Sequence, residues 1–330
     1  MEERITTICQ NFIENVNVVK KVFRFESSLM YPIASNALTA QGVTADETKL
    51  KECKAIVSKN AGAFSFLNGL VAAPFAVNLS MKDDPKSSFD KVERFYSVIK
   101  KQFSRSDFSA LLAIQLSDFV SEENLESVVG RGRELYRLMK EKHPFLTSEN
   151  DSVLAGFLAL SEKDNAVLID DMEECYELLK NKFSDKDSIQ TVSHILSIST
   201  GSAHEKAKHM IELYDMLKDA GRKFGTDYLA ILAAVSILDE NNEKLLNIIL
   251  EIDDFLATQK GYGFLGSFDK KTRLMHATML TIDLYNIAMN SQVPVNAYSL
   301  AMIAAQQIAI CTIIATIIII ASAAVVTTTD

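Results

Sequence analysis

Apolar residues recur at steps of three and four along most of the chain, with polar residues between them. The clearest example lies near the middle, where one apolar stripe is formed by Ile169, Met172, Tyr176, Leu179 and Phe183. This spacing follows the 3.6-residue turn of an α-helix, so the stripe predicts an amphipathic helix. Apolar residues at positions 175 and 178 widen the stripe, as expected for a helix that packs on two neighbours.

The same segment is repeated along the chain. The sequence ECYELLK at residues 174–180 has close copies, which read RFYSVIK at 94–100, ELYRLMK at 134–140 and ELYDMLK at 212–218. Weaker copies begin at residues 52 and 251. The third position of the six copies is occupied by Lys54, Tyr96, Tyr136, Tyr176, Tyr214 and Asp253. Successive copies are 38–42 residues apart, which is a period typical of helical repeat proteins.

Each copy is followed by a joint and then by a second, more apolar helix. The joint contains a phenylalanine and then small or polar residues, which end one helix and begin the next. These phenylalanines are Phe64, Phe103, Phe145, Phe183, Phe224 and Phe264. Examples of the second helix are residues 110–116, 152–160, 191–198 and 229–238. An acidic or polar turn follows it, so the unit is a buried helix, a turn, an amphipathic helix and a joint.

These units predict an all-α fold, specifically an α-solenoid of about six helical hairpins, because one such hairpin cannot bury its apolar faces alone. The first helix, at about residues 2–22, stands outside this register and is expected to cap the array. The chain is expected to end in a further hydrophobic helix. The predicted division is a helical repeat domain at residues 1–296 and a hydrophobic tail at residues 297–330.

The tail has an unusual composition. No charged residue lies between Asp283 and Asp330, and residues 308–326 contain eight isoleucines and two valines. Such a stretch is long enough to span a membrane, and insertion scales favour it by about 3–6 kcal/mol. No lysine, arginine or aromatic belt flanks it, so a buried or self-associating helix is the alternative. The isoleucines available for either contact include Ile308, Ile313, Ile314, Ile317, Ile318 and Ile320.

The net charge and the cysteine spacing exclude some classes of function and of binding site. The net charge is −9, from 34 basic and 43 acidic side chains, and there is no basic stripe, which argues against nucleic-acid binding. The cysteines show neither zinc nor disulfide spacing, so reduced thiols are expected. They are Cys9, Cys53, Cys175 and Cys311. The acidic start lacks a signal-peptide pattern, which predicts a cytoplasmic protein.

Two segments resemble binding motifs without the required context. Residues 261–266 (GYGFLG) match GxGxxG, but a dinucleotide-binding loop follows a strand, and here a helical pattern precedes the segment. Residues 204–209 (HEKAKH) resemble the HExxH of zinc proteases, but the histidines are five residues apart and diverge around a helix. We therefore expect no metal and no cofactor.

Two further groups are candidates for ligand binding. His194 and His276 lie on equivalent buried helices two repeats apart, and either face a shared groove or are hydrogen-bonded members of the core. No serine or cysteine nucleophile with an adjacent base is recognisable, so no catalytic residue is predicted and an enzyme is not expected.

The second candidate group is the tyrosine ladder, which consists of Tyr96, Tyr136, Tyr176 and Tyr214. A row of tyrosines is suited to gripping a peptide, because each ring supplies apolar area and each hydroxyl a polar tip. Packing between helices is the alternative, since Tyr176 shares its stripe with core residues such as Met172.

Several stretches are similar to a known family. They are residues 142–160 (KHPFLTSENDSVLAGFLAL), 173–183 (EECYELLKNKF) and 259–280 (QKGYGFLGSFDKKTRLMHATML), with MYP at 30–32 and AAQQIAI at 304–310. The chain resembles an uncharacterised bacterial family, domain of unknown function number four thousand and three, over nearly its whole length. The resemblance implies one family domain in a cytoplasmic bacterial protein, and it implies no activity, cofactor or catalytic residue. The isoleucine-rich tail departs from the alanine- and serine-rich tail of that family.

Three functions are compatible with these features. The favoured one is a non-enzymatic scaffold that binds a protein or peptide partner on its repeat surface. The first alternative is an enzyme or small-ligand-binding protein with a site between repeats. The second is an adaptor tethered to the inner face of the membrane through residues 308–326, and self-association through the same residues is also open.

Overall fold

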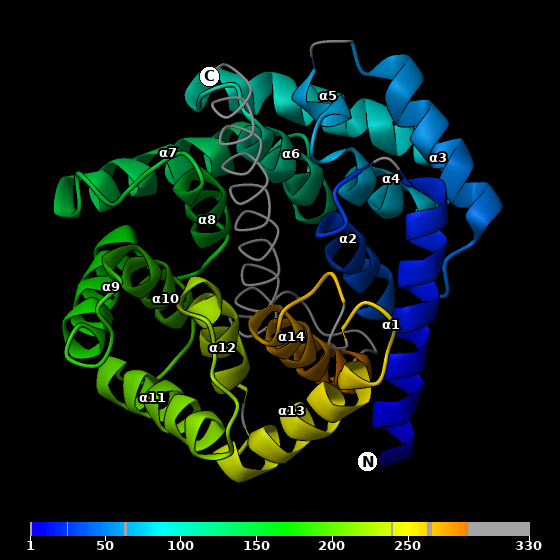
Figure 1. The fold of residues 1–330 in the computed structure, drawn as a ribbon. Coiled ribbons are helices and arrows are strands. Elements are labelled where there is room, and N and C mark those ends of the chain that lie inside the picture. The colour runs from blue at the N-terminus through cyan, green and yellow to red at the C-terminus, as the bar shows by residue number, and fades with distance from the viewer. Residues whose placement is uncertain (1, 25, 63–64, 239, 263–265, 290–330) are drawn as a thin grey trace, which may run out of the picture.

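The computed structural model describes residues 2–24, 26–62, 65–238, 240–262 and 266–289. Fourteen α-helices and two short 3₁₀ helices are found in these residues, which contain no strand. The predicted all-α fold is therefore confirmed. The helices alternate between an outer and an inner layer around a common centre (Figure 1).

The odd-numbered helices form the outer layer and the even-numbered helices the inner layer. The outer helices are α1 (Glu2–Val22), α3 (Glu47–Asn60), α5 (Pro85–Gln102), α7 (Leu125–Lys142), α9 (Asn165–Leu179), α11 (Ala203–Asp219) and α13 (Asn242–Ala257). The inner helices are α2 (Met30–Thr39), α4 (Ala72–Ser80), α6 (Asp107–Phe119), α8 (Asp151–Leu158), α10 (Lys186–Ile198), α12 (Leu229–Ser236) and α14 (Lys270–Met289). The 3₁₀ helices η1 (Phe66–Asn68) and η2 (Thr226–Tyr228) precede α4 and α12.

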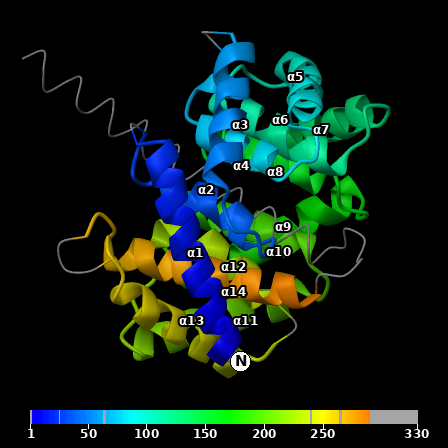
Figure 2. The same ribbon diagram turned by 90° about the vertical axis from the view of Figure 1, so that its right-hand side faces the viewer.

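The two layers close on themselves. Each outer helix packs on the inner helix that follows it, and neighbours within each layer contact one another all the way round. The first helix, α1, contacts α13 and α14 as well as α3, and α2 contacts α14 (Figures 1 and 2). Across this junction the Arg4 guanidinium donates to the carbonyl of Leu284 at 3.3 Å, and the Asn36 amide donates to the carboxylate of Asp283.

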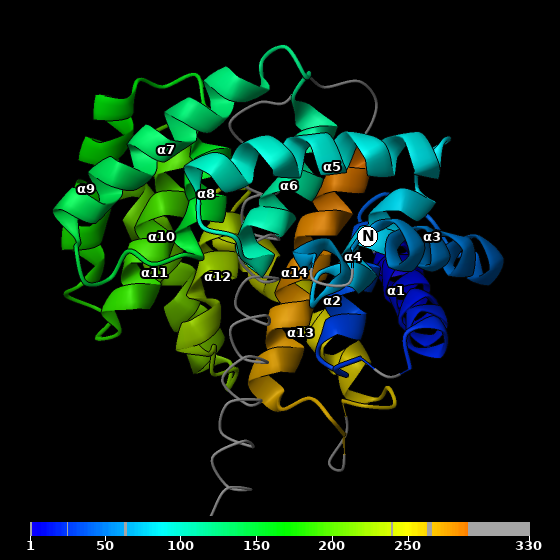
Figure 3. The ribbon, with the colours of Figure 1, turned by 90° about the horizontal axis from the view of Figure 1, so that it is seen from above.

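Closure changes two expectations. The described residues form seven outer–inner pairs in a ring (Figure 3), whereas the repeat register predicted a solenoid of about six hairpins. The helix expected to cap that array, α1, instead pairs with α2 as a full unit and joins the two ends of the ring. The signal for this pair was missing because α1 and α2 lack the repeated tyrosine motif.

Local polar signals set where the helices begin. Asp84 precedes α5 and accepts hydrogen bonds from the backbone N–H groups of Lys86 and Ser87, with Pro85 as the first helical residue. Ser202 and Glu205 form a reciprocal capping box at the start of α11. Such caps satisfy backbone donors that have no partner inside the helix, so the polar turns seen in the sequence fix the ends of the outer helices.

Basic side chains cap the carboxyl ends of several inner helices. The donors and their acceptors are Lys91 with the carbonyl of Ser117, Arg131 with those of Ala159 and Ser161, Lys163 with those of Ser197 and Ser199, and His209 with that of Ser236. Lys91, Arg131 and His209 share one repeat position, five residues before the repeated tyrosine. A donor there both satisfies free carbonyl groups and opposes the negative end of the helix dipole.

The inner layer is packed closely enough to require a glycine. A Cβ atom added at Gly156 in α8 would lie 2.4 Å from Cδ1 of Leu112 in α6, and Leu112 is fully buried. By contrast, a Cβ atom at Gly130 in α7 would have nothing within 4 Å.

We predict that Gly156→Ala lowers the free energy of unfolding by about 1–3 kcal/mol, because Leu112 must leave its packed rotamer. The matched control, Gly130→Ala, should raise it by roughly 0.5–1 kcal/mol, since alanine favours the helix. Urea unfolding followed by circular dichroism measures both. Equal effects of the two substitutions would contradict the close approach of α6 and α8.

A buried carboxylate ties the last repeats together. Asp253 in α13 is fully buried, and its oxygens accept from Nε of Arg222 and from Nε of Arg273, each at 2.7 Å. Arg222 lies in the joint between α11 and α12, whereas Arg273 lies in α14. The neighbouring Asp254 is exposed, and of these two arginines it forms an ion pair only with Arg222.

We predict that Asp253→Asn costs about 3–5 kcal/mol of unfolding free energy, because it leaves two guanidinium groups without their buried partner. Asp254→Asn should cost less than about 1 kcal/mol, as is usual for an exposed ion pair. The midpoints of chemical denaturation of the two variants, each compared with that of the parent chain, measure this difference. A small effect at Asp253 would show that water replaces the carboxylate.

Candidate functional site

A hollow of about 1140 Å³ lies at the rim of the ring where α10 and α12 end. Its walls come from the turn after α10, the first half of α11, the end of α12 with the following turn, and α14. The ionisable side chains that line it are Glu205, Lys206, Lys208, His209, Glu212 and Glu240, together with Tyr285. We call it the rim hollow. It brings together segments separated by up to about 85 residues.

The wall formed by α11 presents charges of alternating sign. The Glu205 carboxylate accepts from the backbone N–H and the hydroxyl of Ser202 at 3.1 and 2.8 Å, and these hydrogen bonds lower the pKa of Glu205. Lys208 and Glu212 follow on the same helix, with 3.7 Å between ammonium and carboxylate. Because residues three and four apart share a helix face, the three charged groups form one ladder along the hollow.

The lysine at the base of this wall forms a buried ion pair that stabilises the fold. Lys206 is buried, and its ammonium lies 2.7 and 2.6 Å from the two carboxylate oxygens of Asp171 in α9. Lys163 reaches the same carboxylate at 3.1 Å while capping α10. An ion pair of this burial is held by its partners, so Lys206 positions α11 against α9.

A histidine joins α11 to the end of α12. Nδ1 of His209 donates to the carbonyl of Ser236 at 2.6 Å, and the carbonyl of His209 accepts from the side-chain amide of Asn242 at 3.0 Å. The first contact fixes the tautomer with the proton on Nδ1. This side chain is the histidine at the end of the HEKAKH segment, whereas His204 at its start is exposed.

The opposite wall is a tyrosine–carboxylate–lysine cluster. The hydroxyl of Tyr285 in α14 donates to Glu240 at 3.3 Å, and Lys244 forms an ion pair with the same carboxylate. The hydrogen bond from Lys244 lowers the pKa of Glu240, and partial burial raises the pKa of Tyr285. Glu240 is therefore ionised and Tyr285 neutral at physiological pH.

The rim hollow is equipped for electrostatic binding. The pKa values of Glu205 and Glu240 are lowered by their hydrogen-bonding partners, so neither carboxyl group is tuned toward proton transfer near neutral pH. Along its described walls no serine hydroxyl or cysteine thiol is hydrogen-bonded to a histidine. Among the described residues no group of three or more histidine, cysteine, aspartate or glutamate side chains has metal-binding geometry.

The tyrosine ladder lies elsewhere, between neighbouring outer helices and the joints of the preceding repeat. The ring pairs are Tyr136 with Phe103 at 6.0 Å, Tyr176 with His143 at 4.5 Å and Tyr214 with Phe183 at 4.9 Å between centroids. Tyr96 is also buried. At the first position of the register the Lys54 ammonium lies 4.7 Å from the ring of Phe23 and donates to the carbonyl of Val22. The side chains of Lys54, Tyr136, Tyr176 and Tyr214 thus each contact a joint residue.

The joints differ in how they place their phenylalanine. Phe103, Phe183 and Phe224 are buried, but Phe145 is almost fully exposed. His143 takes the aromatic position in that repeat, where its ring lies at a tilt against that of Tyr176 and contacts Glu173 at 3.1 Å. Phe64 and Phe264 lie outside the described residues.

The two candidate histidines are buried in separate surroundings. Nδ1 of His276 is hydrogen-bonded to the hydroxyl group of Tyr262 at 2.8 Å, and its ring contacts Phe12 of α1. Nδ1 of His194 lies 3.9 Å from the carboxylate of Asp151 in α8. Burial lowers the pKa of both imidazoles to about 3. Their described contacts share no residue, so the structure does not bring the pair together around one ligand.

The remaining sequence motifs fall at joints or beyond the described residues. Gly261 has φ +101° and Tyr262 is buried, immediately after α13, while residues 263–265 lie outside the described part. Ile308, Ile313, Ile314, Ile317, Ile318 and Ile320 also lie outside it. None of the helices in the described ranges is both long and apolar enough to cross a lipid bilayer.

Comparison with known families gives a match over most of the chain. The family model described as "Protein of unknown function (DUF4003)" matches residues 15–320. The chain belongs to this family. The resemblance found in the sequence is thereby confirmed, and the DUF4003 match runs from within α1 through the rest of the ring and into the apolar tail.

A relative of known origin carries no assigned function. The chain is 26% identical to the uncharacterized protein YeaA of Bacillus subtilis (strain 168) over 227 residues, which cover 66% of this chain and 67% of YeaA. No solved structure matches the chain. The site of this DUF4003 protein is therefore argued from its own geometry.

Sequence reasoning did not identify the rim hollow. Two signals could have pointed to its edges, namely the Ser-x-x-Glu capping-box pattern at residues 202–205 and the polar turn before α13. Nothing in the sequence placed Tyr285 beside Glu240, because that contact requires α14 to pack against α12 and α13 inside a closed ring.

The carboxyl group beside His194 provides a pH-dependent test. Asp151 is buried at the start of α8, where it accepts from the backbone N–H of Ser148 at 2.8 Å, and burial raises its pKa to about 6. The folded state therefore binds a proton on the Asp151 carboxyl group more tightly than the unfolded state does. The stability that the protonated carboxyl group contributes is fully present below about pH 4 and is lost as pH rises through 6.

We predict that Asp151→Asn, which keeps an acceptor oxygen but cannot ionise, gains about 2 kcal/mol relative to the parent chain between pH 4 and pH 7. Unfolding free energies at both pH values measure this difference. Val167→Asn, at an exposed position on α9, is the control and should change the unfolding free energy equally at both pH values. A constant offset between Asp151→Asn and parent would contradict the raised pKa.

Proposed function

We propose that this protein binds a polar peptide segment of a partner protein in the rim hollow and carries out no chemical reaction there. The observation that carries the proposal is the hollow of about 1140 Å³ whose walls hold charges of both signs. Small-molecule sites are commonly about 300–1,000 Å³ and mostly apolar. This hollow is larger and is lined by charged groups of both signs, so it fits a peptide better, because a peptide offers charged side chains and a polar backbone together.

The charges available to a ligand can be separated from those that hold the fold. Lys206 is bound to Asp171, and Glu205 caps the start of α11. Lys208 and Glu212 are exposed, with 64% and 51% of their side chains accessible, and pair only loosely. We therefore assign recognition of the peptide to Lys208 and Glu212, with Tyr285 as an aromatic contact on the facing wall.

The tyrosines and histidines that the sequence suggested as ligand contacts have a structural role in this proposal. Tyr136, Tyr176 and Tyr214 join each outer helix to the preceding repeat, and His194 and His276 are neutral members of the core. In the proposal, these residues stabilise the ring as a whole and do not touch the peptide. A cytoplasmic location is part of the same proposal.

The test is selection of random twelve-residue peptides displayed on phage against the full chain, followed by calorimetric titration of the enriched peptides. We expect mixed-charge peptides whose Kd rises at least about tenfold for the double variant Lys208→Glu with Glu212→Lys. This exchange keeps the net charge and the ion pair but reverses the charge order that a ligand meets.

The matched control is the exchange Lys86→Asp with Asp90→Lys on α5, an exposed pair with the same four-residue spacing outside the hollow. It should leave Kd within about twofold of the parent value. Enrichment of no peptide, or equal weakening by both exchanges, would overturn the assignment to the rim hollow.

A further inference from the structure

A second, smaller hollow lies beside Lys54, which occupies the position that tyrosine has in the next four repeats. Its volume is about 370 Å³, and its walls come from the turn between α1 and α2, from α3, and from the end of η1 through the start of α4. We call it the α3 hollow. Apolar side chains such as Met30, Val57 and Leu70 line it together with one carboxylate and one ammonium group. This size and this mixture of groups are typical of sites for small molecules.

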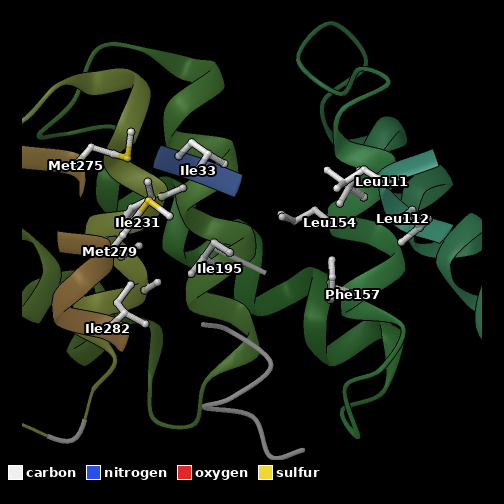
Figure 4. Close-up of a cluster of buried hydrophobic side chains, with 14 of the residues drawn as sticks. Ile33, Leu111, Leu112, Leu154, Phe157, Ile195, Ile231, Met275, Met279 and Ile282 are labelled. Carbon is white, nitrogen blue, oxygen red and sulfur yellow. The ribbon is translucent and has the colours of Figure 1, made fainter. Parts of the chain in front are cut away.

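The turn that carries the carboxylate, Glu26, is fixed through its backbone. The N–H group of Glu26 donates to the carbonyl of Phe23 at 2.8 Å, and the hydroxyl of Tyr31 donates to the carbonyls of Phe23 and Glu26 at 3.0 and 2.8 Å. Tyr31 lies in α2, whose Ile33 belongs to a cluster of buried side chains that also includes Met275 of α14 (Figure 4). The backbone at Glu26 is therefore preorganised by contacts that involve no ligand.

The side chain of Glu26 has no comparable partner. Among the described residues no donor reaches its carboxylate, and Lys54 acts on it electrostatically without forming an ion pair. Lys54 instead donates to the carbonyl of Val22 at 2.9 Å, with its ammonium 4.7 Å from the ring centroid of Phe23. An ammonium group has three N–H donors, so this hydrogen bond leaves the others for a ligand. The α3 hollow thus contains an acceptor group and a donor group whose hydrogen-bonding capacity is largely unused.

We propose that the α3 hollow binds a small zwitterion with an apolar part, namely an α-amino acid with an apolar side chain. The ammonium group of the ligand pairs with Glu26, its carboxylate pairs with Lys54, and its apolar side chain contacts the apolar part of the lining. A simple amine meets the positive charge of Lys54, and a simple carboxylate meets the negative charge of Glu26, so a zwitterion suits both groups best. The α3 hollow shares no lining residue with the rim hollow, so this proposal and peptide binding can fail separately.

Binding of this kind depends on pH. Burial raises the pKa of Glu26 to about 7, against the smaller opposing effect of Lys54 on α3. A protonated carboxyl group cannot pair with an ammonium group, so binding releases a proton and the affinity rises with pH. From α2, Tyr31 also faces Glu26 and stays neutral, because burial raises its pKa above the ordinary value. Arg24 on the same turn is exposed, and the lining residues from η1 and α4 carry no charge.

The test is calorimetric titration of the full chain with L-leucine, L-methionine and L-phenylalanine. We expect at least one of them to bind at least about tenfold more tightly than its two analogues that lack either the carboxylate or the ammonium group. For leucine these analogues are 4-methylpentanoate, without the ammonium group, and 3-methylbutylamine, without the carboxylate. Between pH 6 and pH 8 the Kd should fall on the order of tenfold. Saturable binding of none of the three amino acids, or an analogue that binds as tightly, would overturn the proposal.

Two variants and two matched controls locate the ligand. Glu26→Gln should raise Kd at least about tenfold at pH 8 and remove its pH dependence, and Lys54→Met should raise it as much at both pH values. Glu52→Gln and Lys59→Met change exposed residues of α3 outside the hollow and should leave Kd within about twofold of the parent value. Equal effects of variants and controls would contradict the α3 hollow as the site. The analogue series on the unmodified chain decides the question where a variant does not fold.

Discussion

The packing of α1 against α13 and α14 is the contact on which the rest of the architecture depends. In an open array the terminal repeats each leave one face without a neighbour and need a polar cap. Here the junction covers both faces at once, through contacts such as Arg4 with Leu284 and Asn36 with Asp283. These pairs are 280 and 247 residues apart, so the ring is complete only when nearly the whole described chain has folded.

The two rims of the ring differ because the inner helices all run in the same direction between them. At one rim, aromatic side chains from the outer helices pack on the joints of the preceding repeat, as Tyr136 does on Phe103. At the other, the inner helices end and their free carbonyl groups accept from basic side chains such as Lys91 and His209. The rim hollow lies on this second side, where polar groups are already required by the helix ends. Its mixed charge therefore follows from helix polarity as well as from the ladder on α11.

Sequence periodicity was sufficient to predict the helices and the repeat register, because both depend on residues within about forty positions along the chain. The six positions from Lys54 to Asp253 each lie on an outer helix, as the stripe around Tyr176 indicated. Closure could not be predicted, since the α1–α2 pair lacks the repeated motif and its partners are at the other end of the chain. The sequence also could not show that His143, and not Phe145, packs in its joint. Either aromatic ring fits the joint, and only the packing of the folded chain selects one.

The extra pair formed by α1 and α2 also sets the width of the ring. In a closed ring of six packed helices the distance from axis to helix equals the distance between neighbours, so one central helix would fit without slack. A seventh helix increases that distance by about 15%. The number of helical pairs therefore sets how far the inner helices lie from the axis of the ring.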